Sequence, residues 1–302
     1  MVKGQVSVIK GVFMNSLVLP GNLVSIQWLA EHHNHSNLVL LDASWHMPLT
    51  QRNGYQEWLN ERIDNSRFFD FDREVCDQQA SLPHMMPTPQ HFELSAQMLG
   101  INNDSVIVVY DSLGIFSSPR VWWMFKTMGF NNIAVLDGGL PAWKEAGLTV
   151  NTDSPKTEQR KQGDFKAKYQ ADLISNKDDV YEAIEDEQVA IVDARSKDRF
   201  LGKVPEARNG LRSGHMPSAI NLPISEILNN QTMKNAYQLA QIFEALMPQK
   251  QRLVFSCGSG VTACILALAA KLAGYDALSV YDGSWSEWGA NETLPVVQCK
   301  NV

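Results

Sequence analysis

Short apolar runs alternate along the chain with longer segments that have helical spacing. The runs are rich in Leu, Ile and Val and end in Asp, Ser or Cys, and they occupy 38–44, 106–112, 189–196 and 252–259. The helical segments between them include 90–99, 119–128, 236–246 and 262–273. Strands that alternate with helices predict an α/β fold, in which a parallel sheet is covered by helices on both faces.

The same motifs occur twice in the same order, which indicates an internal duplication. Three pairs of residues carry the comparison: Asp42 with Asp193, Asp111 with Cys257, and Asp137 with Asp282. The members of these pairs lie 151, 146 and 145 residues apart. We therefore expect two domains of one fold, 17–150 and 165–302, joined by a polar linker at 151–164.

The second copy places a cysteine where a ligand would bind. In open parallel sheets, ligands bind beyond the carboxyl ends of the strands, and Cys257 follows the strand that contains Leu253, Val254 and Phe255. The loop Cys257-Gly258-Ser259-Gly260-Val261-Thr262 then leads into a helix. Two glycines permit a sharp turn, so the N–H groups of the loop can converge on an anion at the positive end of the helix dipole. We expect a lowered thiol pKa for Cys257 and hence a nucleophilic thiolate.

Other roles for the cysteines are less well supported. Most cysteines are small buried residues, and Cys264, inside an apolar helix, is expected to be one of them. Cys76 and Cys299 have no chemical context. A cysteine phosphatase needs an arginine six residues after the nucleophile, where this chain has Ala263. A cysteine hydrolase would need a histidine base, which the sequence does not identify.

Composition narrows the classes of function. Apolar residues make up 44% of the 302 residues, and the formal net charge is −7 with no basic block, which argues against nucleic-acid binding. No apolar run approaches the roughly 20 residues that span a bilayer. Residues 1–16 are interpreted as an N-terminal extension. Four cysteines without a CxxC pair favour a reducing cytoplasm. An anionic substrate of this acidic chain would need arginines close to the site.

At this point the residues resemble a known family. CGSGVTA (257–263) is similar to the active-site loop of 3-mercaptopyruvate sulfurtransferases, which are members of the two-domain rhodanese superfamily. The likeness runs from about residue 17 to the C-terminus and includes LDASWHMP (41–48), RFFDFD (67–72), LPHMMP (82–87), SSPRVWWMF (117–125), LDGGLPAW (136–143), SGHMPSAINLP (213–223) and DGSWSEW (282–288). It implies two tandem rhodanese-like domains, the N-terminal one non-catalytic, with Asp111 in place of the cysteine.

The resemblance also implies a reaction and a substrate site. Cys257 would carry sulfur as a persulfide, taken from 3-mercaptopyruvate with release of pyruvate and passed to a thiophilic acceptor such as a small thiol or thioredoxin. Arg199 and Arg208 match the family arginines that bind the carboxylate and carbonyl of the donor, although alone they would be interpreted as surface residues. Arginine suits this task because its planar fork takes two oxygens at once. The other residues expected at the substrate are Gly258, Ser259, Gly260, Val261 and Thr262. No metal and no cofactor is expected.

Two alternatives stay open, and one motif departs from the family. Thiosulfate could be the donor on the same machinery, although the neutral Gly258-Ser259 pair favours mercaptopyruvate; a non-catalytic persulfide relay is the second alternative. Many relatives have a histidine before the FFD motif, where this chain has Arg62. Trp45 and His84 are expected either to line the cleft or to pack in the core or at an interface, and His215 is expected to have a structural role.

Overall fold

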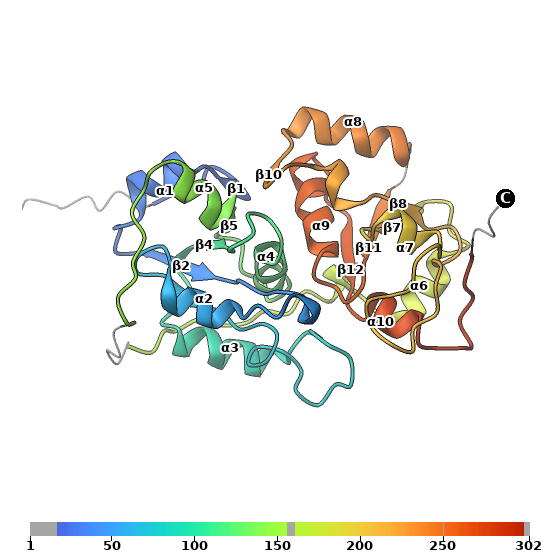
Figure 1. Ribbon diagram of the computed structural model, residues 1–302, viewed down its shortest axis with the longest axis horizontal. Helices are drawn as coiled ribbons and strands as arrows, with labels where there is room; N and C mark the ends of the chain where they lie inside the picture. The colour runs from blue at the N-terminus through green and yellow to red at the C-terminus, as the bar shows by residue number, and fades with distance from the viewer. Residues whose placement is uncertain (1–16, 156–160, 250, 299–302) are drawn as a thin grey trace, which may run out of the picture.

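The computed structural model describes residues 17–155, 161–249 and 251–298. Over these ranges the chain forms two lobes that lie side by side, blue to green and yellow to red in Figure 1. The expected extension 1–16, part of the predicted linker (156–160) and Cys299 lie outside the described residues.

The first lobe is built on a parallel sheet with five strands among the described residues. Its order across the sheet is β1-β5-β4-β2-β3. The strands are β1 (Leu23–Val24), β2 (Leu38–Asp42), β3 (Arg67–Phe68), β4 (Val106–Tyr110) and β5 (Ile133–Leu136). The helices are α1 (Ile26–His32), α2 (Gly54–Asn60), α3 (Pro89–Met98), α4 (Ser118–Thr127) and α5 (Gly139–Glu145), with a 3-10 turn η1 at Pro48–Thr50.

The second lobe repeats this plan. Its sheet has the order β6-β12-β11-β7-β8, again with parallel neighbours. The strands are β6 (Ile174–Ser175), β7 (Val189–Asp193), β8 (Ile220–Asn221), β11 (Arg252–Ser256) and β12 (Leu278–Tyr281). The helices are α6 (Lys177–Ala183), α7 (Lys197–Phe200), α8 (Ala236–Leu246), α9 (Ala263–Leu272) and α10 (Ser284–Trp288), with 3-10 turns η2 (Ala171–Leu173) and η3 (Ile224–Glu226) and the hairpin β9 (Leu228–Asn229) and β10 (Thr232–Met233).

The two sheets confirm the predicted α/β fold and the predicted duplication. In each lobe the first strand is followed in space by the fifth, fourth, second and third. The central strands are apolar because both faces of the sheet are covered, as is usual in parallel sheets. All five residues of β4 are buried, for example. The expected helices at 90–99, 119–128, 236–246 and 262–273 correspond to α3, α4, α8 and α9.

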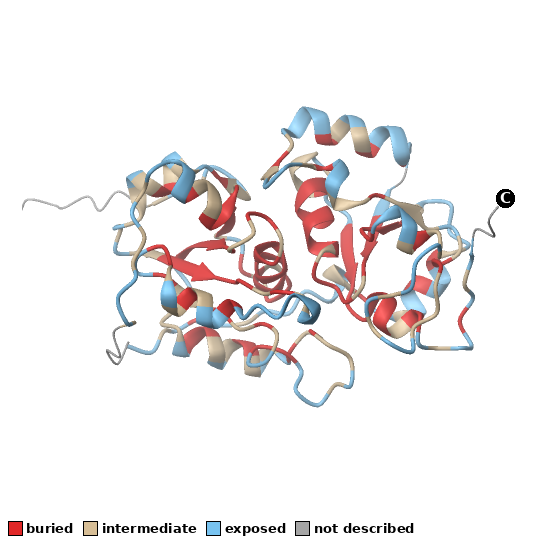
Figure 2. Ribbon diagram, in the orientation of Figure 1, coloured by how far each residue is buried: buried red, intermediate tan, exposed pale blue. Residues whose placement is uncertain are grey.

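Alternate residues of each strand pack on opposite faces of the sheet. In the first lobe, Val39 and Ile107 face α3 and α4, whereas Leu40 and Val108 face α1 and α5. In the second lobe, α8 and α9 cover one face, and α6 and α10 cover the other. Figure 2 shows α4 and α9 buried along almost their whole length. The period of two in side-chain direction therefore divides each lobe into two apolar layers.

The lobes meet through equivalent helices. Helix α4 packs against α9, and one continuous apolar core extends across both helices into the two sheets. The chain that follows the first lobe stays close to it, because Phe165 packs beside Phe92 and Phe125 and its N–H donates to Ile101. The two lobes are therefore packed against each other through a shared apolar core. In the described parts of the chain, no helix has the length and apolar character needed to cross a membrane.

Candidate active site

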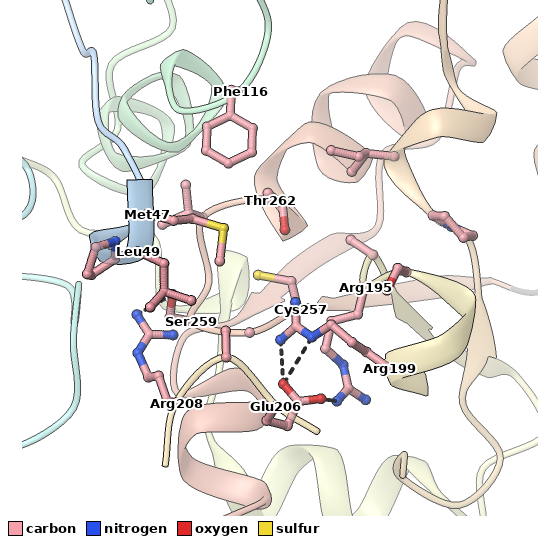
Figure 3. Close-up of a pocket in the computed structure, with 18 of the residues that line it drawn as sticks. Met47, Leu49, Phe116, Arg195, Arg199, Glu206, Arg208, Cys257, Ser259 and Thr262 are labelled. Carbon is pink, nitrogen blue, oxygen red and sulfur yellow. Dashed lines mark hydrogen bonds and ion pairs between the residues drawn. The ribbon is translucent and has the colours of Figure 1, made fainter. Parts of the chain in front are cut away.

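A cavity of about 390 Å³ opens where the two lobes meet at the carboxyl end of β11. The second lobe contributes Cys257 and most of the polar groups, and the first lobe contributes Trp45, Met47 and Phe116. In Figure 3, Cys257 lies between the apolar side chains of Met47 and Phe116 and a charged cluster that includes Arg199 and Glu206. The cavity can thus hold a small molecule with one apolar end and one charged end.

Cys257 is the first residue after β11 and is 2% exposed. Its N–H donates to Ser284 Oγ at 3.1 Å, and its carbonyl accepts from the N–H of Trp285 at 3.0 Å. The Ser284 hydroxyl in turn donates to the carbonyl of Tyr281 at 2.8 Å. The turn after β12 therefore fixes the backbone of Cys257 through these hydrogen bonds, while Cys257 itself lines the cavity.

The loop amides divide into two groups. Gly258, Ser259, Val261 and Thr262 line the cavity, and none of their N–H groups donates to an acceptor among the described residues. The expectation for Gly260 is corrected, because its N–H donates to Ser284 Oγ at 3.1 Å and Gly260 is not among the residues that line the cavity. Gly260 has a φ of +76°, a backbone conformation that favours glycine, so the turn itself requires a glycine at this position.

The equivalent loop of the first lobe shows how such a turn holds an anion. Asp111 follows β4 as Cys257 follows β11. Its carboxylate accepts the N–H groups of Leu113 (2.9 Å), Phe116 (2.9 Å), Ser117 (3.0 Å) and Ser118 (2.9 Å), and the Ser118 hydroxyl (2.7 Å). In the first lobe, a side chain of the loop itself therefore fills the cradle for an anion. The cysteine loop has the same place in the fold but has no carboxylate.

Arg208 brings a positive charge to the edge of the cysteine loop. Its Nη2 donates to Ser259 Oγ at 3.3 Å and its Nη1 to Ser286 Oγ at 3.5 Å, both long bonds to neutral groups. In the described ranges, no carboxylate pairs with Arg208. Burial, the largest influence, lowers the pKa of Arg208 below its ordinary value, although the group stays cationic at neutral pH. This guanidinium is free to bind an anionic ligand.

Arg199, the second predicted arginine, is held by a buried carboxylate. Glu206 has a side chain only 1% exposed and accepts from both Arg199 and Arg195, the latter at 2.8 Å. Arg195 also pairs with Asp193 at 2.6 Å and lies over the ring of Trp285. Figure 3 shows Glu206 bridging the two arginines. This network presents the Arg199 fork to the cavity, where its side chain is 24% exposed.

A side chain at position 258 would fill the gap beside these arginines. A Cβ atom added to Gly258 would lie 3.3 Å from Arg199 Nη2 and 3.9 Å from Arg208 Nη1. Both predicted arginines therefore converge on the residue that follows the cysteine. Because residue 258 is a glycine, the space between the thiol and the two guanidinium groups stays open.

Several cavity residues were not predicted from the sequence. Glu206 and Arg195 carry no motif of their own, although Glu206 lies two residues before Arg208 in PEAR. Met47, Leu49 and Phe116 come from the other lobe, so only the docking of the lobes places them beside Cys257. Apolar residues of that kind have no sequence signal that separates them from core residues.

The remaining candidates have separate positions. Trp45 lines the Cys257 cavity, and His84 lies in edge-to-face contact with it at 4.9 Å, with Nδ1 3.0 Å from Asp72. The ring of His215 stacks on that of Phe200 with the centroids 3.8 Å apart, and its Nδ1 is hydrogen-bonded to the Phe200 carbonyl. These contacts indicate a role in packing. Arg62 donates to the carbonyls of Leu59 and Asp153 and does not line the cavity. Among the described residues, no group of three or more His, Cys, Asp or Glu side chains is placed to hold a metal ion.

Comparison with known proteins assigns the chain to a family. The family model for the Rhodanese-like domain matches residues 25–146 and 176–291. The chain is 39% identical to thiosulfate/3-mercaptopyruvate sulfurtransferase 1, mitochondrial, of Arabidopsis thaliana, over 91% of this chain and 77% of that protein. It is 36% identical to the 3-mercaptopyruvate sulfurtransferase of Escherichia coli K12, over 92% and 98%.

Solved structures agree with this assignment. SseA from Escherichia coli, a 3-mercaptopyruvate sulfotransferase, superimposes with a TM-score of 0.79 at 33% identity, over 88% of this chain and 99% of that chain. Tum1 from Saccharomyces cerevisiae gives a TM-score of 0.82 at 27% identity, over 93% and 99%. The two repeats, the cysteine loop and these similarities lead to one conclusion: the chain belongs to the rhodanese family, as a two-domain sulfurtransferase.

Proposed function

We propose that this enzyme transfers the sulfur of 3-mercaptopyruvate through a persulfide on Cys257 to a thiophilic acceptor and releases pyruvate. One observation carries the proposal: the Cys257 thiol and the forks of Arg199 and Arg208 line the same cavity, on either side of the open space at Gly258. A 2-oxo acid with a terminal thiol has the matching groups, because its carboxylate and carbonyl can bind guanidinium groups while its sulfur reaches the cysteine.

In the first half-reaction, the Cys257 thiolate attacks the sulfur of the donor. A sulfur–sulfur bond forms as the sulfur–carbon bond breaks, and the electron pair of that bond goes to carbon. Pyruvate therefore leaves as its enolate and takes a proton, and the cysteine sulfur is oxidised to a persulfide. Residues 258, 259, 261 and 262 line the same cavity, and in this mechanism their N–H groups stabilise the negative charge of the terminal sulfur.

In the second half-reaction, the acceptor attacks the terminal sulfur and restores the Cys257 thiolate. We propose a small thiol or a thioredoxin-type protein as acceptor and a reducing compartment such as the cytoplasm. Cys257 is a free thiol in the structure, as are Cys76 and Cys264. The Arabidopsis relative is named as mitochondrial. We also propose 17–150 as the non-catalytic domain and 165–302 as the catalytic one.

The choice of donor is the sharpest test. We expect kcat/KM to be higher with 3-mercaptopyruvate than with thiosulfate, because Gly258 and Ser259 add no charge of their own beside the arginines. After exposure to the donor alone, mass spectrometry should find Cys257 heavier by one sulfur atom, and Cys257→Ser should gain none. Full turnover by Cys257→Ser would contradict the mechanism, and a higher kcat/KM with thiosulfate would assign the alternative donor.

A relay role makes a different prediction. A relay module would receive sulfur from the persulfide of a partner protein, so neither small donor would load Cys257. Incubation with each donor, followed by release of the bound sulfur with cyanide, separates the two cases. We expect close to one releasable sulfur per chain with mercaptopyruvate, and none would favour the relay.

A further inference from the structure

Two equivalent aspartates, one in each lobe, accept hydrogen bonds from the backbone of the other lobe. Asp282, in the second lobe, accepts the backbone N–H of Met86 from the first lobe at 2.6 Å. Asp137, its counterpart in the first lobe, accepts the backbone N–H of Met233 from the second lobe at 2.9 Å. Each carboxylate follows the last strand of its own sheet. The two bonds form a reciprocal pair, which we call the aspartate clasps.

Only one of the clasps includes an arginine. Arg120, in α4 of the first lobe, is fully buried and donates its Nη2 to Asp282 Oδ1 at 2.7 Å and to the carbonyl of His84. Burial, the largest single influence, disfavours the cation, but the interactions with Asp282 and Cys264 together outweigh it, so the pKa of Arg120 is raised above its ordinary value. Helix α9 has apolar residues and Cys264 in its first two turns, so this helix supplies no equivalent cation to Asp137.

Arg120 also lies next to the cysteine loop. A Cβ atom on Gly260 would lie 3.3 Å from Arg120 Nη1 and 2.9 Å from the carbonyl of Asp282. The Nη1 and Nε groups of Arg120 have no hydrogen-bond partner among the described residues. The cation therefore lies behind the loop, next to Gly260, and is not among the residues that line the cavity.

Asp282 connects this cation to the backbone of the nucleophile. Two residues after Asp282, the Ser284 hydroxyl accepts the N–H groups of both Cys257 and Gly260, each at 3.1 Å. Ser284 has a φ of +49°, a backbone conformation that surrounding contacts must hold in place. The connection runs from Arg120 through Asp282 and Ser284 to the cysteine loop, and it begins in the non-catalytic lobe.

We propose that Arg120 is a positioning residue for the cysteine loop: through Asp282 and its own place behind Gly260, it keeps the loop in the conformation in which Cys257 receives sulfur. This role rests on the proposed function only in that the loop receives sulfur. It assigns a task to the non-catalytic lobe: the loop is fully assembled only when the lobes are docked. The clasp at Asp137 does not touch the cysteine loop and contributes to docking alone.

The repeat supplies a matched control for the test. Arg120→Met removes the cation behind the loop, Arg120→Lys keeps a charge but loses the fork, and Asp137→Asn weakens the other clasp. We expect kcat with mercaptopyruvate to fall about 10- to 100-fold in Arg120→Met, with KM little changed and partial recovery in Arg120→Lys. Asp137→Asn should lower the thermal midpoint and leave kcat near the parent value.

A second readout does not depend on the donor. The rate at which iodoacetamide alkylates Cys257 is measured as a function of pH. It reports the surroundings of the thiol in the loop, and no sulfur donor takes part in it. We expect Arg120→Met to shift this profile and Asp137→Asn to leave it in place. If Arg120→Met fails to fold, Arg120→Met/Asp282→Asn, which removes both buried charges, is measured against the same expectations. An unchanged alkylation profile and kcat in the folded variant, or an equal loss in Asp137→Asn, would overturn the proposal.

Discussion

At the scale of single residues, the two site arginines differ in their partners. Arg199 shares the Glu206 carboxylate with Arg195, whereas the hydrogen bonds of Arg208 within the described part of the chain are long ones to Ser259 and Ser286. A charge-assisted hydrogen bond gains most where the cation has no other partner. Arg208 is therefore the residue from which we expect the largest contribution to donor binding.

Arg208→Met should raise KM for 3-mercaptopyruvate roughly 10- to 100-fold, since one charge-assisted contact to the donor is lost. Arg208→Lys should recover part of this loss, because the charge returns without the planar fork. Steady-state measurement of pyruvate release gives both constants. Arg252→Met is the control, as Arg252 begins β11 at the end of the strand away from Cys257. A KM in Arg208→Met equal to that of the control would contradict the assignment.

Site residues that belong to a recognisable motif can be predicted from the sequence. A residue such as Glu206, whose task is to hold another site residue in place, cannot. Cys257 was found because its loop has a glycine pattern, and the arginines because they match family positions. Glu206 was missed since a buried carboxylate that holds an arginine looks like any surface glutamate until its exposure of 1% is known. Its burial depends on the side chains of Arg195 and Arg199, which come from the segment around α7.

At the scale of elements, the cysteine loop uses its two glycines for different purposes. Gly260 needs its positive φ and lies against Asp282 and Arg120, so it shapes the turn. Gly258 has no such conformation, and a Cβ there would meet only the ends of the two site arginines. The sequence predicted a sharp turn with converging amides, but it could not distinguish these roles, because they depend on what lies behind each residue.

Alanine at the two glycines should therefore give different losses. Gly260→Ala should lower the free energy of unfolding by about 1–3 kcal/mol, because alanine is strained at this φ and meets a backbone oxygen at 2.9 Å. Gly258→Ala should keep the unfolding midpoint and lower kcat/KM, since its methyl group enters the space beside Arg199. Denaturant unfolding and donor kinetics on both variants separate the effects. A stable Gly260→Ala with a destabilised Gly258→Ala would reverse the assignment.

At the scale of the whole molecule, the duplication explains both what could and what could not be foreseen. The matched motifs predicted two lobes of one fold, because each copy repeats the same apolar pattern and the sheet follows from it. They did not predict that Asp137 and Asp282 reach across the interface, since contacts between lobes depend on how two finished surfaces meet. For the same reason the apolar wall from Met47 and Phe116 was absent from the predicted site.

The docking of α4 on α9 brings two lysines of different lobes into one cavity, Lys126 and Lys271. Burial, followed by the charge of Lys271, lowers the pKa of Lys126 to about 8. In the unfolded chain the pKa is near 10.4, so between pH 8 and 10.4 the unfolded state binds more protons than the folded state. The free energy of unfolding must therefore rise with pH across this window, and at neutral pH the charged Lys126 destabilises the docked form.

Lys126→Met tests whether the charged Lys126 destabilises the folded protein at neutral pH. The variant should lose the rise in stability between about pH 8 and 10.4, which we expect to be roughly 1–3 kcal/mol in the parent, because Lys126 is partly exposed. At pH 7 the variant should be more stable than the parent by a similar amount, less the bonds that Lys126 makes to Asn131. Lys144→Met, which removes an exposed lysine paired with Glu61, controls for the loss of one charge. Denaturant unfolding at several pH values gives the free energy of unfolding as a function of pH. Parallel curves for the parent and Lys126→Met would show that docking of the lobes does not lower the pKa of Lys126.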